Sequence, residues 1–409
     1  MVSSYSSDPV INKRIDEFIY LRGVIASGNK TLEYRLKWMK TLLTATNYKL
    51  YSYINVKGTA VAPEQVMANK HLFIKAFVSH LQKLLRELNA NRDPRKDKTF
   101  DEVCYIQGCL YMHDYQKYGQ DFGYERDDEE AERFLKYAME LNPSLFQAYY
   151  KLGELYESQQ IDDKFDMALE QYKESAKMGY NKAIFKIALI FLYVPKVRLV
   201  KFIKYFKELA SIDMESADIK LEGPDRDELE EIVGLALFQL GKTYEGIYPG
   251  DLTEEDEFIQ EALSIAPVDY GKSLSYYNRA AKLHCLEAQV RLGRVYEFGE
   301  LNRKPNSSKS IQWYIKATTS ALKFKRHPEA MLGVSRWFLK GSNGTSKHIP
   351  YPDPEGAIMW CERACMEFRY PEAYYQMGLL VEGDFADGDP YEWFAKAAEL
   401  GHQEAQKRI

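Results

Sequence analysis

The chain has 409 residues, 45% of them hydrophobic, and its 60 acidic and 55 basic residues give a formal net charge of −5. This length and composition suit several globular domains or one long repeat array, and the slight acidic excess argues against general nucleic-acid binding. The longest apolar run, residues 187–194, is far shorter than the roughly 18 residues that a membrane span needs. The sequence therefore predicts a folded protein without a transmembrane segment.

Residues 1–98 are predicted to form helices without a repeated motif. Pro9 favours the start of a first helix that runs to about residue 27, and Thr31 favours a second helix that runs to about residue 55. A third helix starts at Pro63 and carries one apolar stripe, formed by Phe73, Phe77, Leu81, Leu84, Leu85 and Leu88. We interpret 1–98 as a helical N-terminal extension or cap that ends in a polar linker, residues 89–98, because the ends of a repeat array need covering.

Residues 99–409 are predicted to form a repeat array of about six to seven units. Thr99 and Glu102 have the spacing of a capping box and predict the start of the first repeat helix. A Leu-Gly-x-x-Tyr motif then recurs in complete or degenerate form. Its anchors are Gly108, Gly153 with Tyr156, Gly241 with Tyr244, Gly293 with Tyr296, Gly333 and Gly378. A glycine inside a helix costs about 1 kcal/mol relative to alanine, so its recurrence indicates a close helix crossing.

A second signature follows each anchor, an aromatic residue four positions before an alanine. It occurs at Phe134, Tyr172, Tyr276, Trp313, Trp360 and Trp393. Residues four apart share a helical face, so the aromatic residue is expected to fill space between helices while the alanine admits a neighbouring backbone. A third signature, with Gly, His or Pro before a Glu-Ala or Lys-Ala pair, joins one unit to the next, as at His402 and Ala405. Each unit is therefore predicted to be a helix–loop–helix.

These three signatures together resemble the Sel1-like repeat family, which is related to tetratricopeptide repeats. The best match is the last unit, where Trp393 begins Trp-Phe-Ala-Lys-Ala-Ala-Glu-Leu-Gly-His, and residues 269–299 match nearly as well. The resemblance covers about residues 100–409 and implies an all-α fold, an α/α superhelical solenoid with a helical N-terminal extension. Within that family the chain resembles the fungal chitin synthase activators and the related activator of protein kinase C signalling.

Insertions and one basic stripe stand out between the repeat motifs. Residues 212–230, 246–268 and 340–354 are predicted insertions, which either extend the rim of the array or bind a partner. Lys201, Lys204 and Lys207 share one helical stripe opposite apolar residues. This stripe is either an ordinary solvated helix face or a docking surface for an acidic partner or an anionic membrane.

Motifs of catalysis are missing from the sequence. It contains no His-Glu-x-x-His, no phosphate-binding glycine loop and no Gly-x-Ser-x-Gly, so we predict no catalytic residues, no cofactor and no enzyme activity. The odd number of cysteines, five, suits a reducing compartment. Cys361 and Cys365 lie one helical turn apart without a nearby histidine, so we expect packing there and no metal site.

The predicted function is that of a scaffold or adaptor that binds protein partners along its repeats, as repeat arrays do. The resemblance implies a non-catalytic regulator of a membrane-bound synthase or of cell-wall signalling. The expected location is the cytoplasm, with peripheral association at a membrane as an open alternative. Two other hypotheses are an adaptor of endoplasmic-reticulum-associated degradation and the regulatory region of a larger enzyme.

Overall fold

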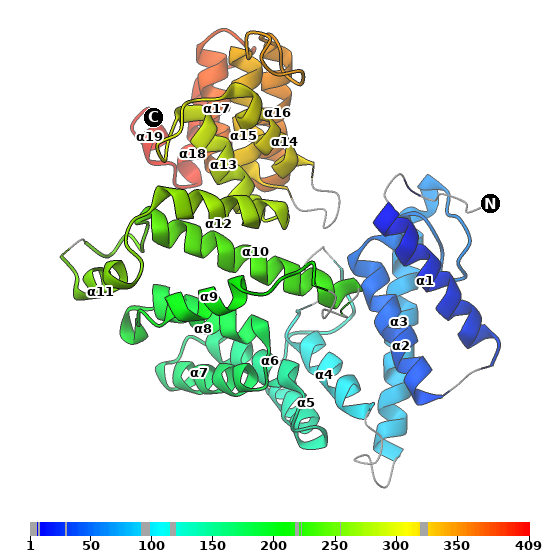
Figure 1. Cartoon of the computed structure of the whole chain (residues 1–409). Helices are drawn as coiled ribbons and strands as arrows, with labels where there is room; N and C mark the ends of the chain where they lie inside the picture. The colour runs from blue at the N-terminus through cyan, green and yellow to red at the C-terminus, as the bar shows by residue number, and fades with distance from the viewer. Residues whose placement is uncertain are drawn as a thin grey trace. The chain divides into compact units, whose positions relative to one another are not determined.

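The protein is α-helical throughout the part of the chain that the structure describes (Figure 1). The computed structural model describes residues 6, 9–28, 31–90, 99–114, 120–216, 221, 223–253, 255–319 and 326–409. These residues form helices α1 to α19 and no strand, apart from one isolated bridge between Ile54 and Ala60. The predicted all-α class is confirmed. The chain divides into two compact units, residues 1–187 and 188–409.

Three helices begin the first unit and share one core. They are α1 (Pro9–Ala26), α2 (Leu32–Asn47) and α3 (Val66–Ala90). The rings of Phe18 and Trp38 lie 4.9 Å apart, and Phe18 also contacts Phe73 of α3. Most of the predicted apolar stripe of α3 is buried in this core, while Leu88 is buried in a second cluster with α4 and Leu85 is half-buried. The predicted linker falls largely on residues 91–98, which lie outside the described part of the chain.

The second helix is shorter than predicted, because α2 ends at Asn47 and a 3-10 turn, η1 (Leu50–Ser52), follows. Lys49 between them has a positive φ of 54°, which interrupts the helix. The turn buries Tyr51 and, just after it, Ile54, and the Asn69 side chain of α3 donates hydrogen bonds to the carbonyls of both residues. Burial of these apolar side chains against α3 outweighs the local preference for a longer helix.

The remaining helices of the first unit form hairpins. They are α4 (Phe100–Tyr111), α5 (Asp128–Leu141), α6 (Phe146–Ser158) and α7 (Asp162–Lys177), and α8 (Asn181–Tyr193) contains the division between the units. The predicted capping box at Thr99 is wrong, because the Thr99 side chain makes no cap hydrogen bond. The Glu102 carboxylate instead pairs with Lys40 of α2 at 2.6 Å, a contact between distant segments that the local motif cannot reveal.

The second unit continues the same arrangement. A short 3-10 turn, η4 (Pro195–Val197), comes before the remaining helices. These are α9 (Phe202–Ala210), α10 (Gly223–Glu245), α11 (Glu257–Ile265), α12 (Tyr270–Lys282), α13 (Leu286–Phe298), α14 (Ser307–Thr318), α15 (Pro328–Lys340), α16 (Pro354–Phe368), α17 (Pro371–Glu382), α18 (Pro390–Glu399) and α19 (Gln403–Gln406). From α12 onward each helix packs on the next one along the chain, and Figure 1 shows α13 to α18 as adjacent rods.

In this unit the second helix of several hairpins begins with a side-chain N-cap. Asp269, Asn306, Asp353 and Asp389 precede α12, α14, α16 and α18, and each accepts a hydrogen bond from a backbone N–H of the first turn. Such caps satisfy backbone donors that have no partner within the helix. The second helix of each of these hairpins therefore begins at a position that the sequence specifies locally.

The predicted insertions take three different forms. The segment 212–230 is not a single loop, because α10 begins at Gly223, while residues 217–220 and 222 lie outside the described part. The segment 246–268 contains α11, and Asp251 in it pairs with Arg198 at 3.0 Å. In the segment 340–354 the Ile349 side chain is buried in the core of its own repeat. Only the structure shows that this last insertion is packed, since its Gly and Pro content is typical of an open loop.

Candidate protein-interaction surface

The anchor glycines lie where two helices cross, and an aromatic ring of the following helix covers most of them. A Cβ atom added to Gly153 would lie 2.6 Å from the Tyr172 ring, and one added to Gly293 would lie 2.5 Å from the Tyr314 ring. The same arrangement brings Gly241 against Tyr277 and Gly378 against Phe394, whereas Gly108 meets Leu135. No Cβ fits at these distances, so glycine allows the ring to lie directly on the helix backbone.

Gly333 differs, because it shares the ring of the preceding repeat. A Cβ atom added there would lie 2.6 Å from Tyr314, the same ring that covers Gly293. In the Gly333 repeat the residue after the expected Trp360, which corresponds to Tyr314 and Phe394 of other repeats, is Cys361, and it is fully buried. One tyrosine thus fills the space beside two glycines from consecutive repeats, and it cannot move away from one without approaching the other.

The covering ring is one residue later than the aromatic residues that the sequence pattern singles out. Tyr277, Tyr314 and Phe394 are buried, while their neighbours Trp313 and Trp393 are half-buried. Tyr172 alone is both the expected residue and the covering ring. Several repeats have aromatic residues at both the predicted position and the next one. Only the rotation of the helix about its axis, which tertiary packing sets, shows which of the two rings faces the glycine.

The tryptophan anchors instead lie beside cations of their own helices. Lys316 Nζ is 4.5 Å from the Trp313 ring centroid, the Arg363 guanidinium is 4.6 Å from Trp360, and Lys396 Nζ is 4.8 Å from Trp393. The cation follows the ring by three positions, which places both groups on one helix face. Trp360 and Trp393 also pack partly against buried core residues. All three rings are half-buried.

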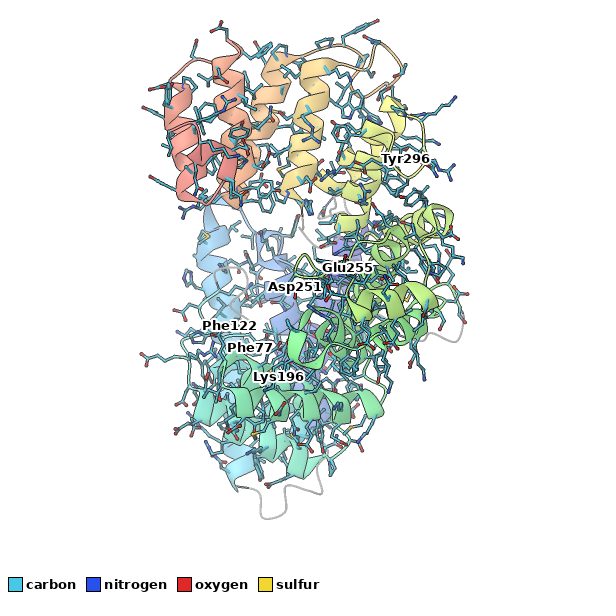
Figure 2. All side chains as sticks on the ribbon, turned by 90° about the vertical axis from the view of Figure 1, so that its left-hand side faces the viewer. Phe77, Phe122, Lys196, Asp251, Glu255 and Tyr296 are labelled. Atoms are coloured by element: carbon cyan, nitrogen blue, oxygen red, sulfur yellow. The ribbon has the colours of Figure 1, made fainter. Side chains whose placement is uncertain are left out.

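The tyrosines of the Leu-Gly-x-x-Tyr motif are mostly buried. Tyr156 donates a hydrogen bond to Glu132 Oε1 at 2.8 Å. Tyr244 stacks on Tyr276 with ring centroids 5.5 Å apart, and the half-buried Tyr296, labelled in Figure 2, lies 5.0 Å from Lys309 Nζ. Their role in binding a partner stays a prediction, because these contacts show packing within the chain.

A Tyr–Glu–cation group, which sequence reasoning missed, links consecutive repeats. In the second unit Tyr314 donates a 2.6 Å hydrogen bond to Glu297, and Arg336 of the next repeat pairs with the same carboxylate at 2.9 Å. Two further groups have the same arrangement. They are Tyr172, Glu157 and Lys186 in the first unit, and Tyr277, Glu245 and Arg291 in the second.

The sequence signal for this group is a glutamate four residues after the anchor glycine. It is present after Gly153, Gly241, Gly293 and Gly378 and absent after Gly333. After Gly378 the glutamate, Glu382, pairs with Arg408 at 2.7 Å, although Phe394 replaces the tyrosine. Because three helices contribute to each complete group, the group fixes the register of one repeat on the next.

Burial controls the protonation of these groups. Removal from solvent, together with the neighbouring Glu297 carboxylate, raises the pKa of the Tyr314 phenol well above its usual value of 10. The pKa of Arg336 is also raised, because the hydrogen bond to Glu297 and its negative charge outweigh the opposing effect of burial. At neutral pH the group is therefore a neutral phenol that donates to a carboxylate neutralised by a guanidinium.

We expect Glu297→Ala to lower the free energy of unfolding of the second unit by about 2 kcal/mol, because it leaves the buried Tyr314 hydroxyl and the Arg336 guanidinium without their acceptor. Glu297→Gln should cost less, since the amide oxygen still accepts from Tyr314. Urea unfolding followed by tryptophan fluorescence measures both. The matched control is Glu404→Ala, whose exposed pair with Lys407 should contribute little to stability. Equal effects of Glu297→Ala and Glu404→Ala would contradict the structural role of the group.

The predicted lysine stripe lies on the exposed face of α9. Lys201 and Lys204 are exposed and Lys207 is half-buried. The aliphatic and phenylalanine side chains of α9 are buried, and Tyr205 is half-buried. Within the described part of the chain, none of the three lysines has an ion-pair partner. Lys207 Nζ lies 5.9 Å from the Tyr244 ring centroid. The stripe is a candidate docking surface, and its binding role stays a prediction.

The cysteines and histidines show no catalytic arrangement in the described residues. All five cysteines are buried free thiols, and no group of three His, Cys, Asp or Glu side chains in the described ranges could hold a metal ion. His327 and His402 each accept a backbone hydrogen bond at a helix start. None of the described helices combines the length and apolar character needed to cross a bilayer.

Paired helices with glycine–ring crossings define a helical-repeat protein of the α/α class. The Sel1 repeat family model matches residues 110–143, 146–180, 261–285, 286–320, 328–367 and 371–402. The chain belongs to the Sel1 repeat family, which confirms the resemblance drawn from the motifs. A solved relative, a Sel1 repeat protein from Oxalobacter formigenes, is 15% identical with a TM-score of 0.47, and the match covers 95% of this chain and 92% of the other.

Curated relatives from fungi are also similar to this chain. Chitin synthase regulatory factors 3 and 4 of Schizosaccharomyces pombe are 29% and 27% identical to it over 58% and 64% of its length, which correspond to 22% and 43% of the relatives. Activator of C kinase protein 1 of Saccharomyces cerevisiae is 27% identical over 99% of this chain and 62% of the relative. In each case the chain spans less than two-thirds of the relative's length.

Proposed function

We propose that this chain is a non-catalytic adaptor that binds protein partners through its Sel1 repeats and regulates chitin synthesis in a fungal cell wall. The observation that carries the proposal is the similarity to the chitin synthase regulatory factors over more than half of the chain, in a family of repeat proteins. Helical repeats bind through extended surfaces with many modest contacts, which suits a partner larger than a small molecule.

A second candidate function is activation of C kinase signalling. It is favoured by a specific observation: the match to Activator of C kinase protein 1 extends over 99% of this chain, including the three N-terminal helices that precede the repeats. The two functions share one mechanism, in which the array holds a catalytic partner without contributing to the reaction. The names of these fungal relatives support neither of the two other hypotheses, a degradation adaptor and the regulatory region of a larger enzyme.

The proposed partner is a membrane-bound synthase or a signalling protein. In this proposal the chain acts in the cytoplasm and reaches the membrane peripherally, through its partner. The division into a helical extension, residues 1–98, and a repeat array, residues 99–409, is part of the same proposal, with the extension covering the first repeat. Burial of Leu88 of α3 in one core with Phe100 and Cys104 of α4 supports that cover.

The test is reconstitution with each candidate partner. We expect the purified chain to co-purify with detergent-solubilised chitin synthase and to raise the transfer of N-acetylglucosamine into chitin several-fold. In a parallel arm the chain is mixed with C kinase, and phosphorylation of a peptide substrate is measured. Stimulation in the kinase arm alone favours the second function. If neither enzyme is bound or stimulated, the proposal fails.

A further inference from the structure

The second helices of the repeat hairpins differ sharply in charge along the chain. The helices α5, α7, α16 and α18 each contain more acidic than basic residues. In contrast, α9 with its preceding Lys201 has three lysines and one acid, and α12 has three cations, Lys272, Arg279 and Lys282, and no acid. The next second helix, α14, has two lysines and no acid. In a chain of net charge −5, the positive charge is thus concentrated on successive hairpins and is densest on α9 and α12.

The basic faces of α9 and α12 adjoin each other in the second unit. Arg279 of α12 donates a 2.7 Å hydrogen bond to the carbonyl of Ala210, the last residue of α9. Lys207 Nζ and Lys272 Nζ lie 5.9 and 5.3 Å from the same ring, that of Tyr244. These contacts join the two faces into one surface, which we call the basic strip: Lys201, Lys204, Lys207, Lys272, Arg279 and Lys282.

The positive charge of the basic strip is largely uncompensated within the described part of the chain. Its one ion pair there is a 3.6 Å contact between Lys272 and Asp269, and its one acidic neighbour on α9 and α12 is the exposed Glu208. Several cations elsewhere in this unit are neutralised, as Arg291 is by Glu245 and Glu300. An anionic ligand would therefore find cations whose charge is not already neutralised.

The surroundings favour a polypeptide over a lipid bilayer as that ligand. The aliphatic and phenylalanine side chains of α9 are buried and cannot insert into a membrane. The insertion 246–268 contains six acidic and no basic residues, and it lies against α9 through Phe258, whose ring is 5.8 Å from that of Phe202. Two of these acids, Asp251 and Glu255, are labelled in Figure 2, and both are exposed.

An anionic bilayer is flat and broad, so one that covered the basic strip would also come against the carboxylates of the insertion. An extended polypeptide is narrow and need contact only the basic strip. The acidic insertion itself exposes the apolar side chains of Ile247 and Val268, and Tyr270 at the start of α12 is exposed as well. A bilayer that took up these side chains would bring its headgroups against the acids. A single polypeptide avoids that repulsion.

We propose that the basic strip binds an extended acidic segment of a protein partner. This inference rests on the proposed adaptor function and names the chemistry of one contact. Lys201 to Lys207 span about 9 Å along α9, and Lys272 to Lys282 continue the row on α12, so successive carboxylates of an extended chain would meet successive cations. The interaction should weaken steeply with salt, because its charges are exposed.

The probe is a fluorescein-labelled peptide of alternating glutamate and serine, and its binding to the full chain is measured by fluorescence anisotropy. We expect binding at low salt that is lost in 0.5 M salt. The variant Lys201→Glu, Lys204→Glu, Lys207→Glu should bind at least tenfold more weakly. The matched control, Lys37→Glu, Lys75→Glu, Lys83→Glu, makes the same change of net charge at exposed lysines of α2 and α3 and should bind like the unmodified chain.

Other outcomes would overturn the proposal. Failure of the unmodified chain to bind the peptide at low salt would do so, as would equal losses in the two triple variants. Tighter binding to vesicles containing phosphatidylserine than to the peptide, lost in the α9 variant, would assign the strip to a membrane instead. Circular dichroism confirms that both variants keep their helices. If a chitin synthase binds the unmodified chain and the α9 variant equally, the proposed role of the basic strip is rejected, while the proposed adaptor function stands.

Discussion

Replacing Gly293 with alanine should destabilise the second unit by about 2 kcal/mol. The added Cβ would lie 2.5 Å from the buried Tyr314 ring, which overpacks the helix crossing and outweighs the roughly 1 kcal/mol gain in helix propensity. Tyr314 cannot shift freely, because Gly333 of the next repeat lies against the same ring. Urea unfolding followed by fluorescence reports on this unit, since four of the five tryptophans lie in it.

The matched control is Gly23→Ala in α1. Gly23 is also a helical glycine, but nothing lies within 4 Å of the position that its Cβ would occupy. This substitution should leave stability unchanged or raise it by up to about 1 kcal/mol, measured by circular dichroism. Gly333→Ala should behave like Gly293→Ala. If Gly293→Ala and Gly23→Ala shift stability alike, the anchor glycines are not steric requirements of the crossing.

The second unit should unfold steeply as the pH rises above 10. In an unfolded chain a tyrosine ionises near pH 10, but burial and the adjacent carboxylates Glu245 and Glu297 raise the pKa values of Tyr277 and Tyr314 well above that. Above pH 10 the unfolded chain loses protons that the folded chain keeps. The stabilisation is thus complete below pH 10 and declines above it, by about 3 kcal/mol per pH unit for the two tyrosines together.

Urea midpoints measured between pH 8 and 11.5 test this slope. The double variant Tyr277→Phe, Tyr314→Phe loses two hydrogen bonds and should be less stable at pH 8, but its midpoint should fall less steeply with pH. The change of slope therefore separates ionisation from a general loss of stability. Absorbance at 295 nm should show the buried phenols ionising together with unfolding. Ionisation of all tyrosines near pH 10 in a chain that stays folded would contradict the buried Tyr–Glu contacts.

The sequence predicted the repeat anchors better than their partners. Gly153, Gly293 and the other anchor glycines all lie at helix crossings, because a glycine kept inside a helix has a steric cause that recurs with the repeat. The pattern did not show that Tyr314, and not Trp313, covers the glycine, since adjacent residues on a helix differ by about 100° and the packing of the hairpin selects one. It also missed the Tyr–Glu–cation groups, whose members come from three helices.

The candidate docking surface was likewise predictable from the sequence only in part. The helical spacing of Lys201, Lys204 and Lys207 follows from the sequence, and burial of the opposite apolar face agrees with that spacing. The contribution of α12 could not be predicted, because Lys207 and Lys272 come near the same Tyr244 ring only when α9, α10 and α12 are packed. The acidic insertion beside the strip likewise depends on the contact between Phe258 and Phe202.

The sequence by itself determined that this protein is a helical repeat array of the Sel1 type, because periodic glycines, aromatic residues and helix caps act over a few turns of a single hairpin. Tertiary structure decided which ring faces each glycine, where α2 ends, and which charges are neutralised or left exposed. Those features depend on side chains from different hairpins that meet only after folding, at distances along the chain that local helix preferences do not reach.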